Sequence, residues 1–164
     1  YRVFPNIYLT KKANAWLVNA GIDSSNTNDY LALSPKSVFK YTKDLRNYFC
    51  NKNNLEHLGV VIVDSKSSPL RTGTTSFAMS WSGIKPLKNY IGKKDLFGRK
   101  LKYTQQNIVD ALAAFVGIYM GEGNESIPVI ILRGVNTVKF SSSKCKPSDI
   151  FISPEKDIFS VILK

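Results

Sequence analysis

The sequence is poor in cysteine and histidine and has no long apolar run. It holds two cysteines, Cys50 and Cys145, with neither the Cys-x-x-Cys spacing of zinc sites nor the density of a disulfide framework. We therefore predict two free thiols in a reducing cytoplasm. The one histidine, His57, precedes an expected strand, where a solvated loop residue is more common than a catalytic base. No apolar stretch reaches the roughly 18 residues of a membrane span, so we predict no membrane attachment.

Acidic residues are also scarce. The chain carries 12 aspartates and glutamates against 23 lysines and arginines, which gives a formal net charge of +11. The basic residues are spread along the chain, and such a field attracts nucleic acid, anionic lipid or small polyanions such as nucleotides. A lysine-rich solvated surface is an equally good interpretation. No helix-turn-helix, RNP or zinc signature supports a nucleic-acid-binding module, so that hypothesis has the least support.

Length and apolar content favour one globular domain over residues 1–164. At 164 residues, 43% hydrophobic and 12% aromatic, the chain can bury a core and does not have the composition of a disordered protein. It contains no repeat or low-complexity segment. It has no initiator methionine, and residues 2–4 already have the character of folded sequence, so we expect an incomplete chain.

The hydrophobic pattern predicts an α+β fold, with a mixed, mostly antiparallel sheet covered by two main helices. Strands are predicted at residues 7–10, 15–18, 58–63, 74–81 and 128–132, and helices at 35–51 and 104–120. The short spacing around a turn at Lys11-Lys12 favours antiparallel pairs, although the alternation of elements also allows a parallel α/β sheet. The Gly- and Lys-rich connection at 83–103 has the length of a functional segment or an interaction arm. The tail at 149–163 is predicted as an edge strand or short helix.

Each predicted helix has end signals and an apolar face. Ser34 and Pro35 form a start signal for the first helix, and Thr104 and Gly121 bracket the second. Residues at helical spacing should face the core, namely Val38, Tyr41, Leu45 and Phe49 in the first helix and Ile108, Leu112, Phe115 and Tyr119 in the second. A further face of small residues suits close packing, namely Ala111, Ala114 and Gly117.

Three carboxylates follow predicted strand or helix ends. Asp23 lies in a loop rich in hydroxyls and amides, Asp64 follows a β-branched run, and Glu122 follows the second helix. Hard cations such as Mg²⁺ and Mn²⁺ prefer oxygen ligands, and clustered carboxylates repel one another unless a cation neutralises them. One fold could therefore gather the three around a divalent metal. An ordinary turn built on side-chain-to-backbone hydrogen bonds explains the first loop equally well.

Five sequence blocks occur in an order that indicates a family. They are Asn-Ala-Gly-Ile-Asp-Ser-Ser-Asn at 19–26, Val-Ile-Val-Asp-Ser at 61–65, Tyr-x-Gly-x-x-Asp-Leu-Phe-Gly-Arg-x-Leu at 90–101, Met-Gly-Glu at 120–122 ahead of Ile-Pro-Val, and Ile-x-Pro-x-x-Asp-Ile-Phe at 152–159. The chain thereby resembles the coenzyme F420:L-glutamate ligases and their folate-metabolism relatives. The resemblance covers nearly the whole chain, and it implies that residues 1–164 correspond to the larger, C-terminal part of the family fold, without its N-terminal part.

The resemblance implies an amide-bond-forming ligase. Such an enzyme adds L-glutamate through a γ-linked amide to an F420-0 or folate-like acceptor, with GTP as co-substrate and Mg²⁺ or Mn²⁺, and with K⁺ as a further candidate ion. Phosphorylation of the acceptor carboxylate would give an acyl phosphate that the amino group of glutamate attacks. The resemblance also implies a cytoplasmic homodimer. Neither the acceptor nor the choice between GTP and ATP follows from these residues.

The resemblance assigns binding roles but no catalytic residue. Metal ligation falls to Asp23, Asp64, Ser65 and Glu122. Nucleotide binding falls to Asn26, Met120, Gly121 and Gly123. Lysines and arginines at 93–102 would balance the charge of phosphates and acceptor.

The chain departs from the family pattern in two places. Ser67 and Ser68 stand where relatives have a Gly-Arg pair, which removes a fork-shaped partner for phosphate or carboxylate. The strand at 75–81 carries larger aromatic residues that would reshape an acceptor pocket. An alternative is therefore a homologue that keeps a nucleotide or metal site but has lost or altered the ligase reaction.

Overall fold

The computed structural model describes residues 2–5, 7–12 and 15–161. The chain order of its elements is β1 (Arg2–Phe4), β2 (Ile7–Lys12), β3 (Ala15–Val18), α1 (Val38–Asn53), β4 (Val60–Ser67), β5 (Thr74–Ser82), β6 (Leu87–Asn89), β7 (Gln105–Asn107) and α2 (Ile108–Met120), with short 3-10 helices at Asn19–Gly21, Pro147–Asp149 and Pro154–Lys156. Every strand pair is antiparallel. The predicted α+β class is confirmed, although the strands form separate sheets of three, two and two strands rather than one.

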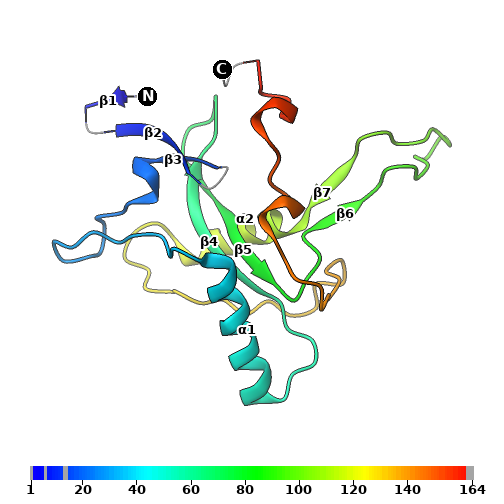
Figure 1. Cartoon of the computed structure of the whole chain (residues 1–164), viewed down its shortest axis with the longest axis horizontal. Coiled ribbons are helices and arrows are strands. Elements are labelled where there is room, and N and C mark those ends of the chain that lie inside the picture. Colours follow the sequence, from blue (N-terminus) through cyan, green and yellow to red (C-terminus); the bar gives the residue numbers. More distant parts are fainter. Residues whose placement is uncertain (1, 6, 13–14, 162–164) are drawn as a thin grey trace.

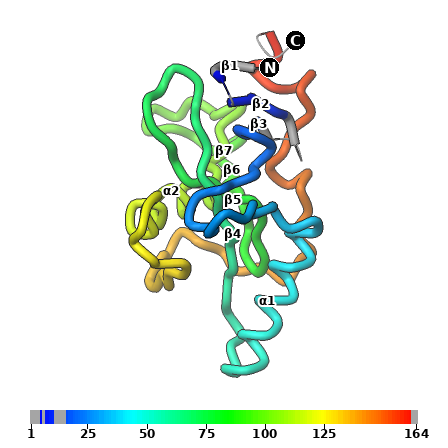
Figure 2. The backbone as a smooth tube through the Cα atoms, turned by 90° about the vertical axis from the view of Figure 1, so that its left-hand side faces the viewer, coloured from blue at the N-terminus to red at the C-terminus, as the bar shows by residue number. Residues whose placement is uncertain are grey.

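The β4–β5 ladder is the centre of the molecule. In Figure 2 it lies between α2 on one side and α1 on the other, and both helices contact β5. Strand β4 carries the predicted β-branched run, and β5 places several buried residues along its second half. The register shifts between Ile62 and Val63, because Met79 of β5 has no partner on β4. Such a bulge bends the strand and increases its local twist.

The core gathers where the ladder meets both helices. Trp81, Val109 and Ala113 belong to one buried cluster with Ala78 and Ile84. The indole of Trp81 is 0% exposed. The ring of Phe39, from α1, meets it edge to face at a centroid distance of 5.0 Å. Aromatic pairs prefer this offset geometry to face-to-face stacking. Aromatic packing therefore joins the first helix to the ladder.

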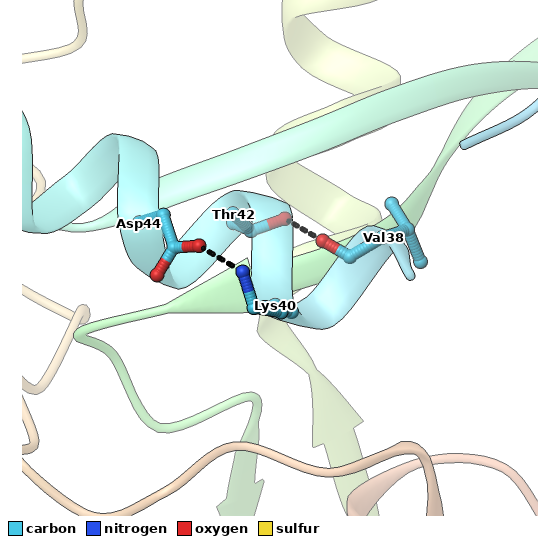
Figure 3. Close-up of polar contacts among 4 residues, drawn as sticks. All are labelled: Val38, Lys40, Thr42 and Asp44. Atoms are coloured by element: carbon cyan, nitrogen blue, oxygen red, sulfur yellow. Dashed lines mark hydrogen bonds and ion pairs between the residues drawn. The ribbon is translucent and has the colours of Figure 1, made fainter. Parts of the chain in front are cut away.

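Helix α1 begins later than predicted and faces the ladder with a different side. It starts at Val38 rather than residue 35, and the hydroxyl of Ser34 donates to the carbonyl of Gly21 at 3.4 Å instead of capping the helix. Thr42 is buried, whereas Tyr41 is 57% exposed. The predicted face was therefore rotated, with Val38 and Leu45 half-buried and Tyr41 and Phe49 outside. Figure 3 shows the two sides, with an ion pair between Lys40 and Asp44 and the Thr42 hydroxyl donating to the carbonyl of Val38.

Helix α2 also begins later than predicted, at Ile108 rather than at Thr104. Its N-cap is Asn107, whose side-chain oxygen accepts a hydrogen bond from the backbone N–H of Asp110. The carbonyl of Thr104 instead accepts from Tyr90 N, because this stretch belongs to a hairpin. Gly121 ends the helix as predicted, with φ +73°, a conformation that favours glycine.

The buried face of α2 is the face that lies closest to β5. A Cβ atom on Gly117 would lie 2.2 Å from Ser76 Oγ, so glycine allows the helix to pack against this strand. Ala113 is buried there, whereas Ala111 and Ala114 are exposed. Of the predicted small-residue face only Gly117 makes the close contact. The predicted apolar face was also partly wrong, since Phe115 and Tyr119 are exposed and pair with each other.

The connection at 83–103 forms most of a long β-hairpin, here named the arm. Strands β6 and β7 make its base, and backbone bonds continue from Tyr90 N to Thr104 O and from Gly92 N to Leu101 O. Figure 1 shows the arm projecting away from the rest of the chain. At its tip Leu96 and Phe97 are 98% and 95% exposed. The segment therefore has the shape of an arm, and its role as a functional or interaction segment stays a prediction.

Other sequence predictions were only partly right. Lys11 and Lys12 continue β2, where they pair with β3, instead of forming a turn. Residues 128–132 form no strand within the part of the chain that the structure describes. They join none of the described sheets. The tail forms two 3-10 helices up to residue 161, and the predicted range continues into residues outside the description.

Candidate metal and nucleotide site

Asp64 lies within β4 rather than after it. The strand continues to Ser67, and Asp64 pairs with Phe77 across the ladder. Its carboxylate accepts a hydrogen bond from the backbone N–H of Ser65 at 2.8 Å. Partial burial raises the pKa of Asp64 above its ordinary value, and the charges of Asp23 and Glu122 raise it further, while the Ser65 bond opposes them. The fold therefore brings Asp23 and Glu122, from two other segments, within electrostatic reach of Asp64.

Asp23 forms a local turn at the surface. The backbone N–H and the hydroxyl of Ser25 both donate to its carboxylate, at 2.7 and 2.8 Å. These bonds, led by the backbone one, lower the pKa of Asp23. A backbone bridge to Ala32 closes the loop. The interpretation as a hydrogen-bonded turn is thus confirmed, and the exposed Asp23 carboxylate adds its charge to the surroundings of Asp64.

The loop after α2 carries Glu122 and is tied to the first loop. The backbone N–H of Gly123 donates to Glu125 Oε2 at 2.9 Å, within the loop. The carbonyl of Gly123 accepts from Asn26 Nδ2, also at 2.9 Å, across 97 positions of sequence. Glu122 is exposed between Gly121 and Gly123. Two of the residues predicted to bind nucleotide, Asn26 and Gly123, are therefore in contact with each other.

The donor chemistry of this site suits a hard divalent cation. Asp23, Asp64 and Glu122 offer carboxylate oxygens and Ser65 offers a hydroxyl, all of which are ligands that Mg²⁺ and Mn²⁺ accept. Burial is the main cause of the raised pKa of Asp64, and the charges of Asp23 and Glu122, which add to it, are charges that a bound cation would offset. As arranged, however, no group of three or more acidic, histidine or cysteine side chains in residues 2–5, 7–12 and 15–161 is close enough to hold a metal ion. Ligation by all three would therefore require their side chains to move together.

Sequence reasoning missed two residues of this site. Ser25 holds the Asp23 carboxylate, and Glu125 folds back so far that a Cβ on Gly121 would lie 2.0 Å from its carboxyl carbon. The spacing Gly-Glu-Gly-Asn-Glu at 121–125 was the available signal, since a short glycine-rich segment lets a nearby carboxylate reach the loop backbone. Met120, half-buried, is the last residue of α2 and was assigned only from the resemblance.

Comparison with known proteins decides the family. The family model for F420-0:gamma-glutamyl ligase matches residues 2–134. This chain belongs to the F420-0:gamma-glutamyl ligase family. The match includes both site loops, β4 and the arm, and so covers four of the five blocks that carried the predicted resemblance, while the block at 152–159 lies beyond it.

Named relatives of this gamma-glutamyl ligase family member align with nearly the whole chain. It is 35% identical to the coenzyme F420:L-glutamate ligase of Archaeoglobus fulgidus over 162 residues, which cover 98% of this chain and 63% of that protein. It is 36% identical to that of Methanocaldococcus jannaschii over 159 residues, covering 96% and 62%. For Methanopyrus kandleri the identity is 32% over 162 residues, covering 96% and 64%. The chain thus spans less than two thirds of the length of these curated relatives.

Three further features bear on the setting of these loops. Among the residues that the structure describes, no helix is long and apolar enough to cross a membrane. Cys50 and Cys145 are both free thiols, as predicted. His57 is exposed, and its ring stacks on that of Phe140 with a centroid distance of 5.0 Å.

Proposed function

We propose that the protein to which this chain belongs is a γ-glutamyl ligase that adds L-glutamate to a coenzyme F420-type acceptor, with a folate-type acceptor as the alternative. The observation that carries the proposal is the family match over residues 2–134, which includes both acidic loops. The electrostatic coupling of Asp23 and Glu122 to Asp64 supports it, because a ligase that handles nucleotide phosphates needs a site for cations. Free thiols are consistent with a cytoplasmic enzyme.

The proposed reaction has two steps. The acceptor carboxylate attacks the γ-phosphorus of GTP, so that GDP leaves and an acyl phosphate forms. The α-amino nitrogen of glutamate then attacks the acyl carbon, inorganic phosphate leaves, and the nitrogen loses a proton as the amide forms. A divalent cation, Mg²⁺ or Mn²⁺, with K⁺ as a further candidate, would offset the phosphate charge in the first step.

This chain's own residues would bind and orient the reactants. Asp23, Asp64, Ser65 and Glu122 would hold the cation, while the glycine-bordered loop after Met120 would approach the nucleotide. The backbone around Gly121 and Gly123 can come close to phosphates because neither residue carries a side chain. Asn26 could reach the nucleotide only by sharing or giving up its bond to Gly123.

The basic arm would supply positive charge for the anionic reactants. Its lysines and arginine lie along both strands and the tip, namely Lys88, Lys93, Lys94, Arg99, Lys100 and Lys102. Lys88 and Lys93 place their ammonium groups 5.1 and 5.2 Å from the ring centre of Tyr90. Such cation–π contacts fix the side chains beside an aromatic surface. An acceptor with an aromatic ring and negative charge would find both features on the arm.

A second copy of the chain is the proposed partner in a homodimer. The segment at 127–132 exposes Val129 and Ile131 by 73% and 75%, whereas Ile130 and Leu132 are half-buried. Such alternation leaves exposed apolar side chains that a second copy of the chain would cover. Replacing Val129 and Ile131 by lysine should shift the sedimentation of a dimer to that of a monomer. An unaltered chain that sediments as a monomer at micromolar concentration would contradict the dimer.

Calorimetric titration with GTP, with and without Mn²⁺, tests the function most directly. The ligase predicts Mn²⁺-dependent GTP binding together with phosphate release that depends on both glutamate and acceptor. The variant Asp64→Asn should lose most of the Mn²⁺-dependent binding, whereas the matched variant Asp44→Asn, on the exposed side of α1, should not. GTP binding without turnover would instead support the alternative of a homologue with lost or altered activity. The serines at 67 and 68, in place of the family's Gly-Arg pair, favour that alternative.

A further inference from the structure

The peptide unit of Gly123 is held from two sides. Asn26 Nδ2 donates to its carbonyl oxygen at 2.9 Å, and its N–H donates to Glu125 Oε2 at the same distance. One partner comes from the loop that carries Asp23, and the other comes from the loop that carries Glu122 itself. We name these two bonds the Gly123 clamp.

The clamp links the two loops whose carboxylates must meet. Asn26 lies three residues after Asp23, and Gly123 directly follows Glu122. Both loops are exposed, and Asp23 is held by its own turn and by the bridge to Ala32. A hydrogen bond between the loops therefore limits how far the Asp23 loop and the Glu122 loop can move apart. Without it, the repulsion between like charges would favour their separation.

The residue types at the clamp suit this role. Asn26 has φ +51°, a backbone conformation that asparagine tolerates better than most side chains, and its amide offers the donor that a carbonyl needs. Glu125 occupies the space beside Gly121 that a side chain there would fill. An acceptor on a flexible stem, next to a residue without a Cβ, can thus reach the N–H of Gly123.

We propose that Asn26 and Glu125 are positioning residues, which hold the Glu122 loop against the Asp23 loop and so prepare the cation site. This inference rests on the proposed function, since it concerns the same site. It differs from the family-based expectation for Asn26, which is a contact with the nucleotide. Positioning partners of metal ligands affect metal binding strongly, by about 10-fold to 100-fold when they are removed.

The test uses a matched pair of asparagines. Asn26→Gly removes the amide without backbone strain, because glycine accepts positive φ. Asn28 has φ +48° in the same loop, so Asn28→Gly is the control for the backbone change. The full chain is titrated with Mn²⁺ alone by calorimetry, and amide hydrogen exchange is followed in the peptide that covers residues 117–126. Asn26→Gly should weaken Mn²⁺ binding by about 10-fold or more and speed exchange in that peptide, and Asn28→Gly should do neither.

A second pair of variants tests Glu125. Glu125→Gln keeps an oxygen that can accept from Gly123 N–H, whereas Glu125→Ala removes it. The clamp predicts fast exchange in the alanine variant and near-normal exchange in the glutamine variant. Equal behaviour of the two variants would overturn the role of the hydrogen bond and leave only an effect of charge.

Three results separate the failure of this inference from the failure of the proposed function. Unchanged Mn²⁺ affinity and exchange in Asn26→Gly, with weaker GTP binding at saturating Mn²⁺, would overturn positioning and support a nucleotide contact. Normal Mn²⁺ binding with altered exchange would overturn the coupling of the clamp to the cation site. Absence of Mn²⁺ binding in the unaltered chain would overturn the proposed cation site itself, and this inference with it.

Discussion

The carboxylate of Asp110 accepts a hydrogen bond from the backbone N–H of Ala78 at 2.9 Å, which joins α2 to the middle of β5. Ala78 lies beside the bulge at Met79, where the ladder to β4 is irregular. The other carboxylate oxygen accepts from the Asn107 amide, which in turn caps the helix. One side chain thus satisfies a strand N–H at the bulge and fixes the start of the helix that leads to Glu122.

Asp110→Ala should destabilise the chain by about 1–3 kcal/mol, because it leaves a partly buried strand N–H without its acceptor and weakens the helix cap. Chemical denaturation followed by circular dichroism measures this. Asp44→Ala is the matched control, since its ion pair with Lys40 is exposed and should contribute only about 0.5 kcal/mol or less. Equal losses in the two variants would contradict the role of Asp110.

Thr42→Val should also destabilise the chain, by about 1–3 kcal/mol. Thr42 and Ser80 are both 0% exposed, and their hydroxyls are hydrogen-bonded to each other between α1 and β5. The Thr42 hydroxyl donates to the carbonyl of Val38, so the Ser80 hydroxyl is left as the donor to Thr42. Valine keeps the shape but leaves the Ser80 hydroxyl buried without its acceptor. The double variant with Ser80→Ala should lose less stability than the two single losses added, and strict additivity would argue against this pairing.

Gly117→Ala should destabilise the chain, although alanine is the better helix former by about 1 kcal/mol. The added methyl group would lie 2.2 Å from Ser76 Oγ and 2.9 Å from Ser76 Cβ, so α2 would have to move away from β5. Overpacking of this kind costs about 1–3 kcal/mol. Introducing Ser76→Gly beside it should restore most of the loss, as judged by thermal unfolding. A more stable Gly117→Ala variant would show that the contact relaxes freely.

The carboxyl of Asp64 should make stability fall as pH rises through its raised pKa. Burial, aided by the Asp23 and Glu122 charges, raises that pKa, so between the unfolded and folded values the folded chain holds more protons. Stability is then greatest below this range, and ionisation of Asp64 lowers it above the range. Asp64→Asn should therefore raise the free energy of unfolding at pH 7 in metal-free buffer and flatten this part of the pH profile.

Asp23 should show the opposite dependence on pH. Bonds from Ser25 lower its pKa, so its contribution is present above the unfolded pKa and is lost as the pH falls through the folded one. Because Asp23 is exposed, this contribution should be small. Denaturation of Asp23→Asn and Asp64→Asn across pH 3–8 compares the two signs. Profiles that change in the same direction would contradict the electrostatic description of the site.

Neutralising the arm should affect binding but not folding. Replacing Lys93, Lys94 and Lys100 by glutamine removes three charges from a projecting hairpin, and surface changes of this kind usually alter stability by about 0.5 kcal/mol or less. If the arm balances the charge of phosphates and acceptor, affinity for GTP or acceptor should fall and its dependence on salt should weaken. Glutamine at Lys36, Lys40 and Lys43, near and within the start of α1, is the control of equal charge. Equal effects in both triple variants would reduce the role of the arm to net charge.

The local pattern of the sequence was sufficient for the class of the fold and for the family. Apolar runs such as that at 60–63 and the glycine stop at Gly121 act over a few residues, so propensity and backbone sterics already determine them. The family blocks likewise need only the order of residues along the chain. The predicted carboxylates Asp23, Asp64 and Glu122 came from such local positions, and the charges of Asp23 and Glu122 do act on Asp64.

Tertiary contacts decided what local pattern left open. Helical spacing could not say which face of α1 turns inward, because the buried partner of Thr42 is Ser80, 38 positions away. Which face of α2 is buried depends on the close contact between Gly117 and Ser76. Where α2 starts depends on Asp110, which accepts a hydrogen bond from the backbone N–H of Ala78 beside the bulge. The bond from Asn26 to Gly123 joins residues 97 positions apart, and a preference of either residue alone carries no information about it. Such contacts form only when segments distant in sequence are packed together. Their stabilising energy therefore depends on the whole fold, and no single stretch of the sequence predicts it.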